Sequence, residues 1–299
     1  MTRTATVVMP TTGDRGPLLP LAVGSVLRQT VADVEIFIIG DGVSDATRQI
    51  AQALTRQDAR VRFFDRPKHP RRGEIYRHEA LQEAQGRIIT YLCDRDLYLP
   101  THLERLTGLL AEADVAMSNF YYVRRDGRLV LPYLAPALTA STEIILSGMA
   151  HTRDYYRTLP HGWRTTPAGT PTDQYMWAQL LGGPGCRAVM NWLPTLLYVK
   201  RDDHPGWSTG RRYAELALWA ERIADADGWQ RLETEVLSRV IQERNYQRLA
   251  PVTIKGRPPR DWPGGLLGQA RRWWERLTGS PAAPAATEID WPAPIRSGR

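Results

Sequence analysis

The stretch Ile88–Pro100, IITYLCDRDLYLP, decides the fold. Its apolar first half, 88–92, predicts a buried strand, and two carboxylates, Asp94 and Asp96, follow the strand one residue apart. Like charges at such a strand end repel each other and lose water, which is costly unless a cation neutralises them. Oxygen ligands of this kind suit Mg²⁺ or Mn²⁺, with phosphate oxygens completing the shell. The stretch therefore predicts a strand end that holds a metal and, through it, a diphosphate. The alternative is a polar loop whose acids face water.

Strands and helices alternate outward from this stretch. Short apolar runs predict strands, and apolar residues at helical spacing predict the helices between them. The predicted strands are 5–9, 34–39, 61–64 and 88–92, and the predicted helices are 18–29, 45–54, 74–84 and one that opens at 101–104. This alternation favours a mostly parallel sheet covered on both faces. Ligands sit beyond the carboxyl ends of such strands, so Asp41, Asp94 and Asp96 are expected to share one crevice.

Local signals predict where these elements begin and end. Pro10 is expected to end the first strand, and Ser44 to cap the helix 45–54. Gly86 is expected to stop the helix 74–84, and residues 101–104 have the form of a capping box.

Composition limits the classes of function. The chain has 299 residues, 42% hydrophobic and 24% charged, as in a globular protein with one large α/β domain or two small ones. It has no apolar run long enough to span a bilayer and no signal-peptide pattern, and its two cysteines make no disulfide framework, so a cytoplasmic location is expected. The net charge of +7 suits phosphorylated small molecules, anionic lipid or nucleic acid. Nucleic acid is not expected as a partner, because zinc-finger, homeodomain and RNA-recognition patterns are absent. The first turn, 10–16, is neither a G-x-G-x-x-G nor a Walker phosphate loop.

Four motifs in order over residues 4–110 resemble those of the family 2 glycosyltransferases. SVLRQT at 25–30 resembles the end of that family's first helix, and 41–47 resembles its D-D-G-S-x-D-x-T motif. Residues 73–86 resemble its G-x-x-x-A-R-N-x-A-L-x-x-A-x-G segment, and 88–103 resemble its acidic motif with the following helix. The resemblance implies the GT-A nucleotide-diphospho-sugar transferase fold, an α/β, Rossmann-like fold with a mixed, mostly parallel sheet flanked by helices. A helical C-terminal extension is expected to follow it.

The resemblance also implies nucleotide-binding roles. Pro10 and Thr11 would line the pocket for the base and ribose, and Asp41 would accept a hydrogen bond from the base, usually uracil. Arg77 would position the base or the diphosphate, and Asp94 would carry the ribose.

A divalent metal, Mn²⁺ or Mg²⁺, is the cofactor that the resemblance implies. Asp94 and Asp96 would form its D-x-D site, and the sequence leaves open which of the two touches the ion. His204 would complete the metal shell or contact the diphosphate, and its alternative is an ordinary surface histidine. Arg95, inside the acidic motif, departs from the family pattern and could replace part of the cation's charge. Gly40 and His78 also depart from it, standing where the family often has Asp and Asn.

The second half of the chain is expected to receive the acceptor. Asp173, in the first turn of a helix that Thr172 is expected to cap, resembles the family's catalytic base, often written E-D, with Thr172 in place of the Glu. The alternative for Asp173 is a plain acid at a helix N-terminus. Trp163 and Trp207 could stack on sugar rings, with ordinary packing as the alternative.

These expectations divide the chain into a catalytic domain at 1–208, with donor half 1–110 and acceptor half 111–208, then helices at 209–279 and a disordered tail at 280–299. Within the second half, 114–123 predicts a strand, 125–128 a hairpin turn and 196–199 another strand. Apolar residues and tryptophans alternate with arginines in 266–277, which favours either contact with an anionic membrane surface or docking on the same domain.

The leading hypothesis is a metal-dependent, inverting glycosyltransferase with a nucleoside-diphosphate sugar as donor, UDP being the expected nucleotide. Its acceptor would be a glycan, a lipid-linked molecule or a small molecule, in the cytoplasm or at the inner face of the membrane. One alternative is a glycosyltransferase-like binding or scaffold protein without catalysis, suggested by the irregular motif at 93–96 and by Thr172. Another is a sugar nucleotidyltransferase, although 13–16 is a poor version of the glycine-rich loop that class carries.

Overall fold

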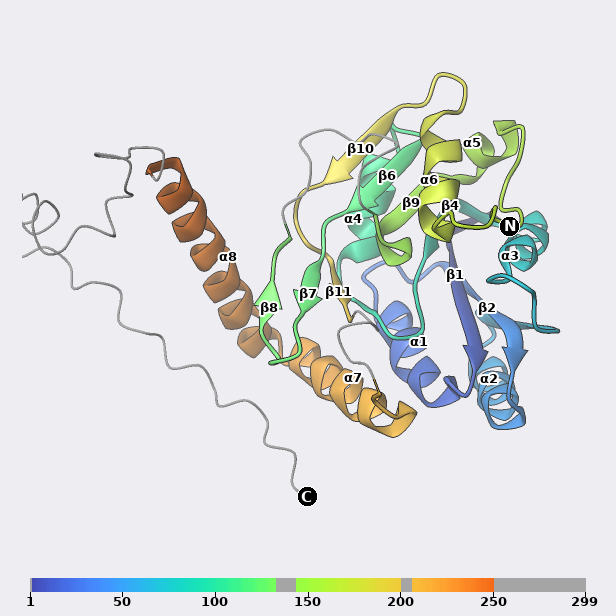
Figure 1. The fold of residues 1–299 in the computed structure, drawn as a ribbon, viewed down its shortest axis with the longest axis horizontal. Coiled ribbons are helices and arrows are strands. Elements are labelled where there is room, and N and C mark those ends of the chain that lie inside the picture. Colours follow the sequence, from blue (N-terminus) through green and yellow to red (C-terminus); the bar gives the residue numbers. More distant parts are fainter. Residues whose placement is uncertain (1, 133–143, 200–205, 250–299) are drawn as a thin grey trace, which may run out of the picture. The chain divides into compact units, whose positions relative to one another are not determined.

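A seven-stranded sheet forms the centre of the fold in the computed structural model, which describes residues 2–132, 144–199 and 206–249 (Figure 1). The strand order is β10-β6-β9-β4-β1-β2-β3. Its members are β1 (Arg3–Gly13), β2 (Val34–Val43), β3 (Val61–Arg66), β4 (Gly86–Tyr91), β6 (Val115–Ser118), β9 (Met149–Thr152) and β10 (Ala188–Asn191). All neighbours pair in parallel except β9, which is antiparallel to both β4 and β6. The predicted mixed, mostly parallel sheet is confirmed.

A smaller four-stranded sheet, in the order β5-β11-β7-β8, lies beside the carboxyl end of β4. Its strands are β5 (Leu97–Tyr98), β11 (Leu196–Tyr198), β7 (Tyr121–Val123) and β8 (Leu129–Val130). Because β5 follows the acidic motif and pairs with β11, this sheet brings the predicted last strand to the end of β4.

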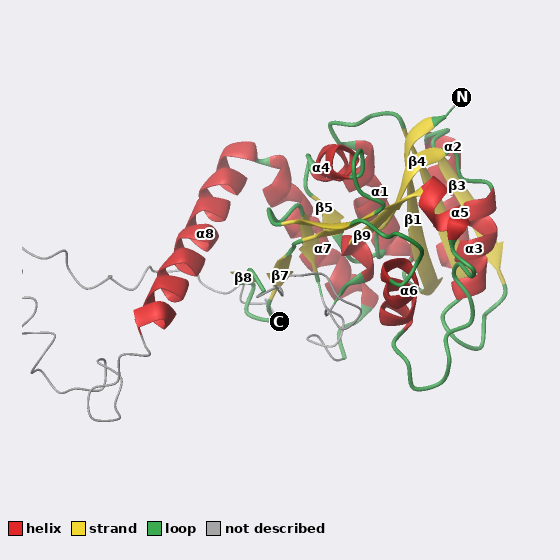
Figure 2. Ribbon diagram, turned by 90° about the horizontal axis from the view of Figure 1, so that it is seen from above, coloured by secondary structure: helices red, strands yellow, loops and turns green. Residues whose placement is uncertain are grey.

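Helices lie on both sides of the large sheet (Figure 2). They are α1 (Leu19–Leu27), α2 (Asp45–Gln57), α3 (Glu74–Gln82), α4 (His102–Leu109), α5 (Arg153–Thr158), α6 (Thr172–Leu181) and α7 (Thr209–Ala224), with short 3-10 turns at Gly16–Leu18 and Leu146–Gly148. Nine of the ten residues of β2 are buried, as expected for a parallel strand covered on both faces. Ser44 caps α2 by accepting a hydrogen bond from the Thr47 amide, as predicted.

Three predicted boundaries were wrong. The strand β1 continues through Pro10 to Gly13. Pro10 lacks an N–H group, but it lies beyond the last residue pair between β1 and β4, so no hydrogen bond to β4 is lost. Gly86 does not stop α3 but opens β4. The capping box predicted at 101–104 does not form: Thr101 makes no side-chain cap to α4, and the Glu104 carboxylate accepts a hydrogen bond of 2.9 Å from Thr30.

The predicted strand 114–123 is divided between the two sheets, into β6 and β7. Asn119 causes the break: its side-chain oxygen accepts a hydrogen bond from the Phe120 amide, and its side-chain nitrogen donates to the Trp192 carbonyl. The hairpin predicted at 125–128 is confirmed, with Gly127 in the left-handed conformation at φ 76°.

The chain divides into two compact units, 1–229 and 230–299. Helix α8 (Ala226–Leu249) begins at the end of the first unit and is the described part of the second. No helix within the described residues is long and apolar enough to cross a membrane. The stripe predicted at 266–277 and the tail predicted at 280–299 lie outside the described residues.

Candidate active site

The turn after β4 sends its two carboxylates to different places. Asp94 accepts a hydrogen bond of 2.8 Å from the Thr11 hydroxyl, and its other oxygen lies 3.5 Å from the Arg15 guanidinium. Asp96 instead points into the protein, where it accepts from the Ser147 hydroxyl and, at 3.0 Å, from the Val199 amide. Both carboxylates are almost completely buried, but only Asp94 lines the neighbouring cavity.

Burial raises the pKa of Asp96 to about 6, and the adjacent Arg95 guanidinium opposes this rise. The Asp96 carboxylate holds the turn in place, because its two hydrogen bonds join it to the chain at Ser147 and to the end of β11. Asp96 therefore has a structural role in this arrangement, and Asp94 is the carboxylate offered to a ligand.

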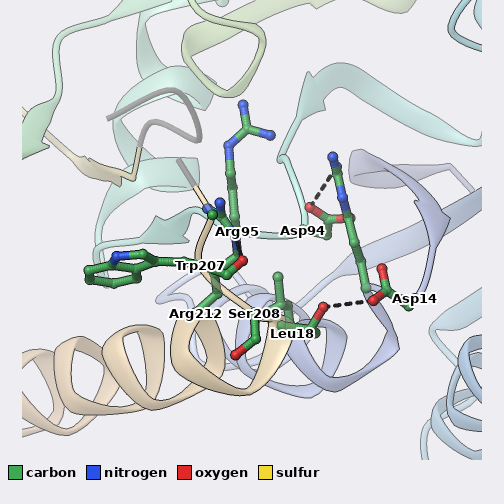
Figure 3. A pocket seen from close by; sticks show the side chains of 10 residues that line it. Asp14, Leu18, Asp94, Arg95, Trp207, Ser208 and Arg212 are labelled. Atoms are coloured by element: carbon green, nitrogen blue, oxygen red, sulfur yellow. Dashed lines mark hydrogen bonds and ion pairs between the residues drawn. The ribbon is translucent and has the colours of Figure 1, made fainter. Parts of the chain in front are cut away.

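A cavity of about 550 Å³ opens beside Asp94 (Figure 3). Its wall combines the turn after β1, the turn after β4 and the start of α7: Asp14, Arg15, Leu18, Asp94, Arg95, Gly206, Trp207, Ser208, Thr209 and Arg212. The Thr209 hydroxyl donates a hydrogen bond of 3.0 Å to Asp14, which ties α7 to the turn after β1. Trp207 is half-buried at this wall, where the Arg211 guanidinium lies 3.9 Å from the centre of its ring. The predicted ligand residue Trp207 thus lines the same cavity as Asp94.

Asp41 lies at the end of β2 and is held by the segment that follows β3. It accepts a hydrogen bond of 2.6 Å from the His69 amide and pairs with the Lys68 ammonium group. Gly73, at φ 66°, allows the chain to pass close to Asp41: a Cβ atom there would lie 3.1 Å from the aspartate side chain. The predicted base-binding carboxylate is therefore fixed in position, with protein donors on both oxygens.

Arg77 and Trp163 pack against each other inside the domain. They are 4% and 3% exposed, and the guanidinium carbon lies 4.6 Å from the centre of the indole ring. The Trp163 ring nitrogen donates a hydrogen bond of 2.8 Å to the hydroxyl of buried Tyr91. Trp163 therefore packs in this structure, the alternative considered for it above, and a sugar would reach its face only after the surrounding segment moved.

Asp173 lies half-buried in the first turn of α6. Burial raises the pKa of Asp173, and the guanidinium groups of Arg77, Arg95 and Arg72 oppose that rise, in this order of strength. The charge of Arg95 acts both on Asp173 and on Asp94. Asp173 also accepts a hydrogen bond from the backbone of Leu146, the residue before the Ser147 that binds Asp96, so the predicted base lies next to the segment that holds the turn after β4.

Thr172 is the first residue of α6, and Pro171 stands at the capping position, so the predicted Thr172 cap was wrong. The Thr172 hydroxyl instead donates a hydrogen bond of 3.4 Å to Glu74 at the start of α3. Glu74 is completely buried and also accepts from the amides of Arg72 and Thr166, at 3.0 and 3.4 Å. Burial works to raise the pKa of Glu74, but these donors bring it below its ordinary value.

Glu74 and Arg15 belong to this site although neither was predicted from the sequence. A glutamate in the first turn of a helix is an ordinary stabilising residue, and its position after Gly73 was the one available signal that the chain turns sharply there. Arg15 stands in a polar turn, and only the fold brings it to the carboxylate 79 positions later.

Of the two carboxylates predicted to bind the metal, Asp94 alone lines the cavity. Within the described residues no group of three His, Cys, Asp or Glu side chains is close enough to hold an ion. Asp94 alone suits a cation that takes its remaining ligands from phosphate oxygens. His204, its third predicted ligand, lies outside the described residues.

Comparisons with known proteins agree with the fold and with the motifs found in the sequence. The chain belongs to glycosyl transferase family 2, whose model matches residues 6–166. A GalNAc(5)-diNAcBac-PP-undecaprenol beta-1,3-glucosyltransferase of Campylobacter jejuni is 27% identical over 138 residues, which cover 46% of this chain and 44% of that protein. The UDP-Glc:alpha-D-GlcNAc-diphosphoundecaprenol beta-1,3-glucosyltransferase WfgD of Escherichia coli is 27% identical over 116 residues, 38% of this chain and 45% of that protein. The matches thus span less than half the length of these relatives.

A solved structure shares the fold. Residues 1–349 of S. aureus TarS, crystallised with UDP-GlcNAc, align with a TM-score of 0.54 and 16% identity over 84% of this chain and 77% of that one. The predicted GT-A architecture is confirmed by this likeness.

Proposed function

We propose that this protein is an inverting glycosyltransferase that moves a sugar from a nucleoside-diphosphate sugar, with UDP as the expected nucleotide, to an acceptor hydroxyl. The proposal rests on membership of glycosyl transferase family 2, and it is supported by Asp173, which accepts a hydrogen bond from the backbone of Leu146, next to the Ser147 that binds Asp96. Family membership and the names of the relatives support the donor class.

Asp173 is the proposed base. As a carboxylate it takes the proton of the acceptor hydroxyl while that oxygen attacks the anomeric carbon, and a single displacement inverts the configuration there. Arg77 and Arg95 favour the ionised form of Asp173, against the effect of its burial.

Asp41 and Thr11 are proposed to bind the nucleotide, since both lie at strand ends on the same edge of the sheet. Asp94 would hold Mn²⁺ or Mg²⁺ together with the donor's phosphate oxygens, and that ion would supply charge neutralisation for the leaving diphosphate. Asp96 acts through the turn, which it fixes by its bonds to Ser147 and Val199.

The proposed acceptor is a lipid-linked glycan, because two relatives are named for undecaprenol diphosphate-linked acceptors. Such an acceptor would be used at the cytoplasmic face of a membrane, which suits the two free cysteines of the chain.

One observation favours the second candidate, a binding protein without turnover. The carboxylates of Asp41, Asp94 and Asp96 are all engaged by protein donors, as they would be in a site that no longer takes ligands.

Calorimetric titration with UDP, GDP, dTDP and CDP, each with and without Mn²⁺, followed by turnover of the matching sugar nucleotides, separates these functions. We expect one diphosphate to bind and its sugar nucleotide to be turned over. Asp94→Ala should weaken the metal-dependent part of this binding. Binding without turnover would favour the second candidate, and the absence of binding would refute the donor site.

The base is tested by Asp173→Asn, with Asp154→Asn as the control, because Asp154 also lies in the first turn of a helix but is exposed. Asp173→Asn should lower turnover by about 10² or more, the contribution typical of a general base, with nucleotide binding retained. Asp154→Asn should leave both unchanged. Turnover at the wild-type rate in Asp173→Asn would refute the assignment.

A further inference from the structure

We propose that Arg15 and Arg95 bind the donor diphosphate from the two sides of Asp94, so that the chain itself supplies much of the positive charge and diphosphate binding persists without a divalent metal. This inference rests on the proposed function, since it describes the same donor site. It assigns to Arg15 a role that no motif indicates.

Arg15 is placed to bind an anion in the cavity. Its side chain is 22% exposed, it lines the cavity wall, and Asp94 is its one ion-pair partner in the described part of the chain. That contact is long, at 3.5 Å, and involves a single nitrogen of the guanidinium group. Since a guanidinium group carries five N–H donors, Arg15 can bind phosphate oxygens while it stays beside Asp94.

Arg95 lies on the other side of Asp94. Figure 3 shows its side chain to one side of that carboxylate and the dashed contact with Arg15 to the other. Its Nε atom is buried and has no hydrogen-bond partner among the described residues. Burial lowers the pKa of Arg95. The neighbouring Cys93, Asp96 and Asp94 raise this pKa by more than burial lowers it, so the guanidinium group stays charged. The guanidinium group also makes a side-chain hydrogen bond with Tyr198, and as a charged residue of the cavity wall Arg95 attracts an anion bound there.

The charges around the cavity favour the binding of an anion even without a bound metal ion. The lining side chains are three arginines, Arg15, Arg95 and Arg212, and two aspartates, Asp14 and Asp94. Three positive and two negative groups give a net charge of +1, before the start of α7 adds its dipole. A site that relied on a metal alone would hold an excess of carboxylates. The volume, about 550 Å³, is in the usual range for small-molecule sites.

The test is calorimetric titration of inorganic pyrophosphate and of UDP into the full chain, in EDTA and in Mn²⁺. We expect the wild type to bind both probes in EDTA. Arg15→Gln should weaken binding of both in EDTA by about tenfold or more, the loss typical of a hydrogen bond to a charged group, and by less in Mn²⁺. The control is Arg187→Gln, which removes the same charge from an arginine paired with Asp114 before β6, at the opposite edge of the sheet.

Two results would overturn the inference: the absence of pyrophosphate and UDP binding by the wild type in EDTA, or equal binding by Arg15→Gln and wild type. Because Arg95 is central to the turn after β4, Arg95→Lys is the second variant. It keeps the charge and should lose less binding affinity in EDTA than Arg15→Gln.

The experiments also distinguish failure of this inference from failure of the proposed function. Arginine-dependent pyrophosphate binding without sugar-nucleotide turnover would refute only the function, and turnover that strictly needs Mn²⁺ and ignores Arg15→Gln would refute only this inference.

Discussion

Thr11 donates a hydrogen bond of 2.8 Å to Asp94, and this bond joins the ends of β1 and β4, which are neighbouring strands 83 positions apart in the chain. Asp94 is therefore held in place by buried protein before any ligand arrives. A fixed carboxylate stabilises charge at a site without the cost of reorganising it during the reaction. Thr11 lies at the end of β1 and Arg15 in the turn that follows, so one short segment sets both the position of Asp94 and the charge balance of the donor site.

Arg77→Met should move the acid side of the pH–rate profile to higher pH. Burial raises the pKa of Asp173, and Arg77 is the foremost of the cations that oppose this rise, so its removal leaves the carboxylate harder to ionise. The base works only when ionised, so activity is lost as pH falls, and the variant should lose it at a higher pH than the wild type. The measurement is kcat/KM for sugar transfer from about pH 5 to about pH 9.

Arg157→Met is the control for this shift, because Arg157 is an exposed arginine near the end of α5. Its profile should match that of the wild type. A uniform loss in Arg77→Met at every pH would show that Arg77 acts on the donor and not on Asp173.

The donor half was predictable because its strands are short, apolar and separated by good helices. A buried parallel strand such as β2 has to be apolar along its length, so its ends are visible in the sequence, and Asp41 and Asp94 follow directly from those ends. The pairing of Asp94 with Thr11 was also within reach, since the carboxyl ends of parallel strands meet at one edge.

The roles of individual side chains beyond those ends were not predictable. Asp94 and Asp96 look equivalent in sequence, and it is the hydrogen bonds from Ser147 and Val199 that show Asp96 to face inward. Trp163 is a candidate for sugar stacking until Tyr91 and Arg77 are seen to enclose it. Both outcomes depend on contacts between distant segments, which composition and spacing do not encode.

Glu74→Gln should lower the free energy of unfolding by about 1–3 kcal/mol, the cost of leaving buried donors without an acceptor. The buried Glu74 carboxylate accepts from the amides of Arg72 and Thr166 and from the Thr172 hydroxyl, so it fastens the segment before α6 to the start of α3. A glutamine keeps one oxygen as an acceptor but turns an NH₂ group toward the donors on the other side. Urea titration at neutral pH measures the loss, and limited proteolysis should show faster cleavage within 164–172.

The control for Glu74 is Glu79→Gln on the same helix, an exposed residue paired with Arg66, which should change stability by less than about 0.5 kcal/mol. The effect of Glu74→Gln should also depend on pH. Because the folded-state pKa of Glu74 is below its ordinary value of 4.5, its stabilisation is complete above that pH and is lost as the pH falls through the folded-state value. A stability difference between wild type and variant that grew in acid would contradict this account.

Gly86→Ala should be among the most damaging single-methyl changes in the protein, although it lies far from the cavity. A Cβ atom at Gly86 would lie 2.2 Å from the backbone nitrogen of Thr6 and 2.5 Å from the carbonyl carbon of Ala5, so β4 and β1 would have to separate where they now pair. Overpacking of this kind costs about 1–3 kcal/mol or more in the free energy of unfolding. Gly108→Ala is the matched variant: Gly108 lies inside α4 with open space around its Cβ position, so alanine there should raise stability by up to about 1 kcal/mol through helix propensity. Urea titration of both variants should therefore give shifts of opposite sign. Equal stability of Gly86→Ala and the wild type would mean that the close approach of β1 and β4 does not constrain this position.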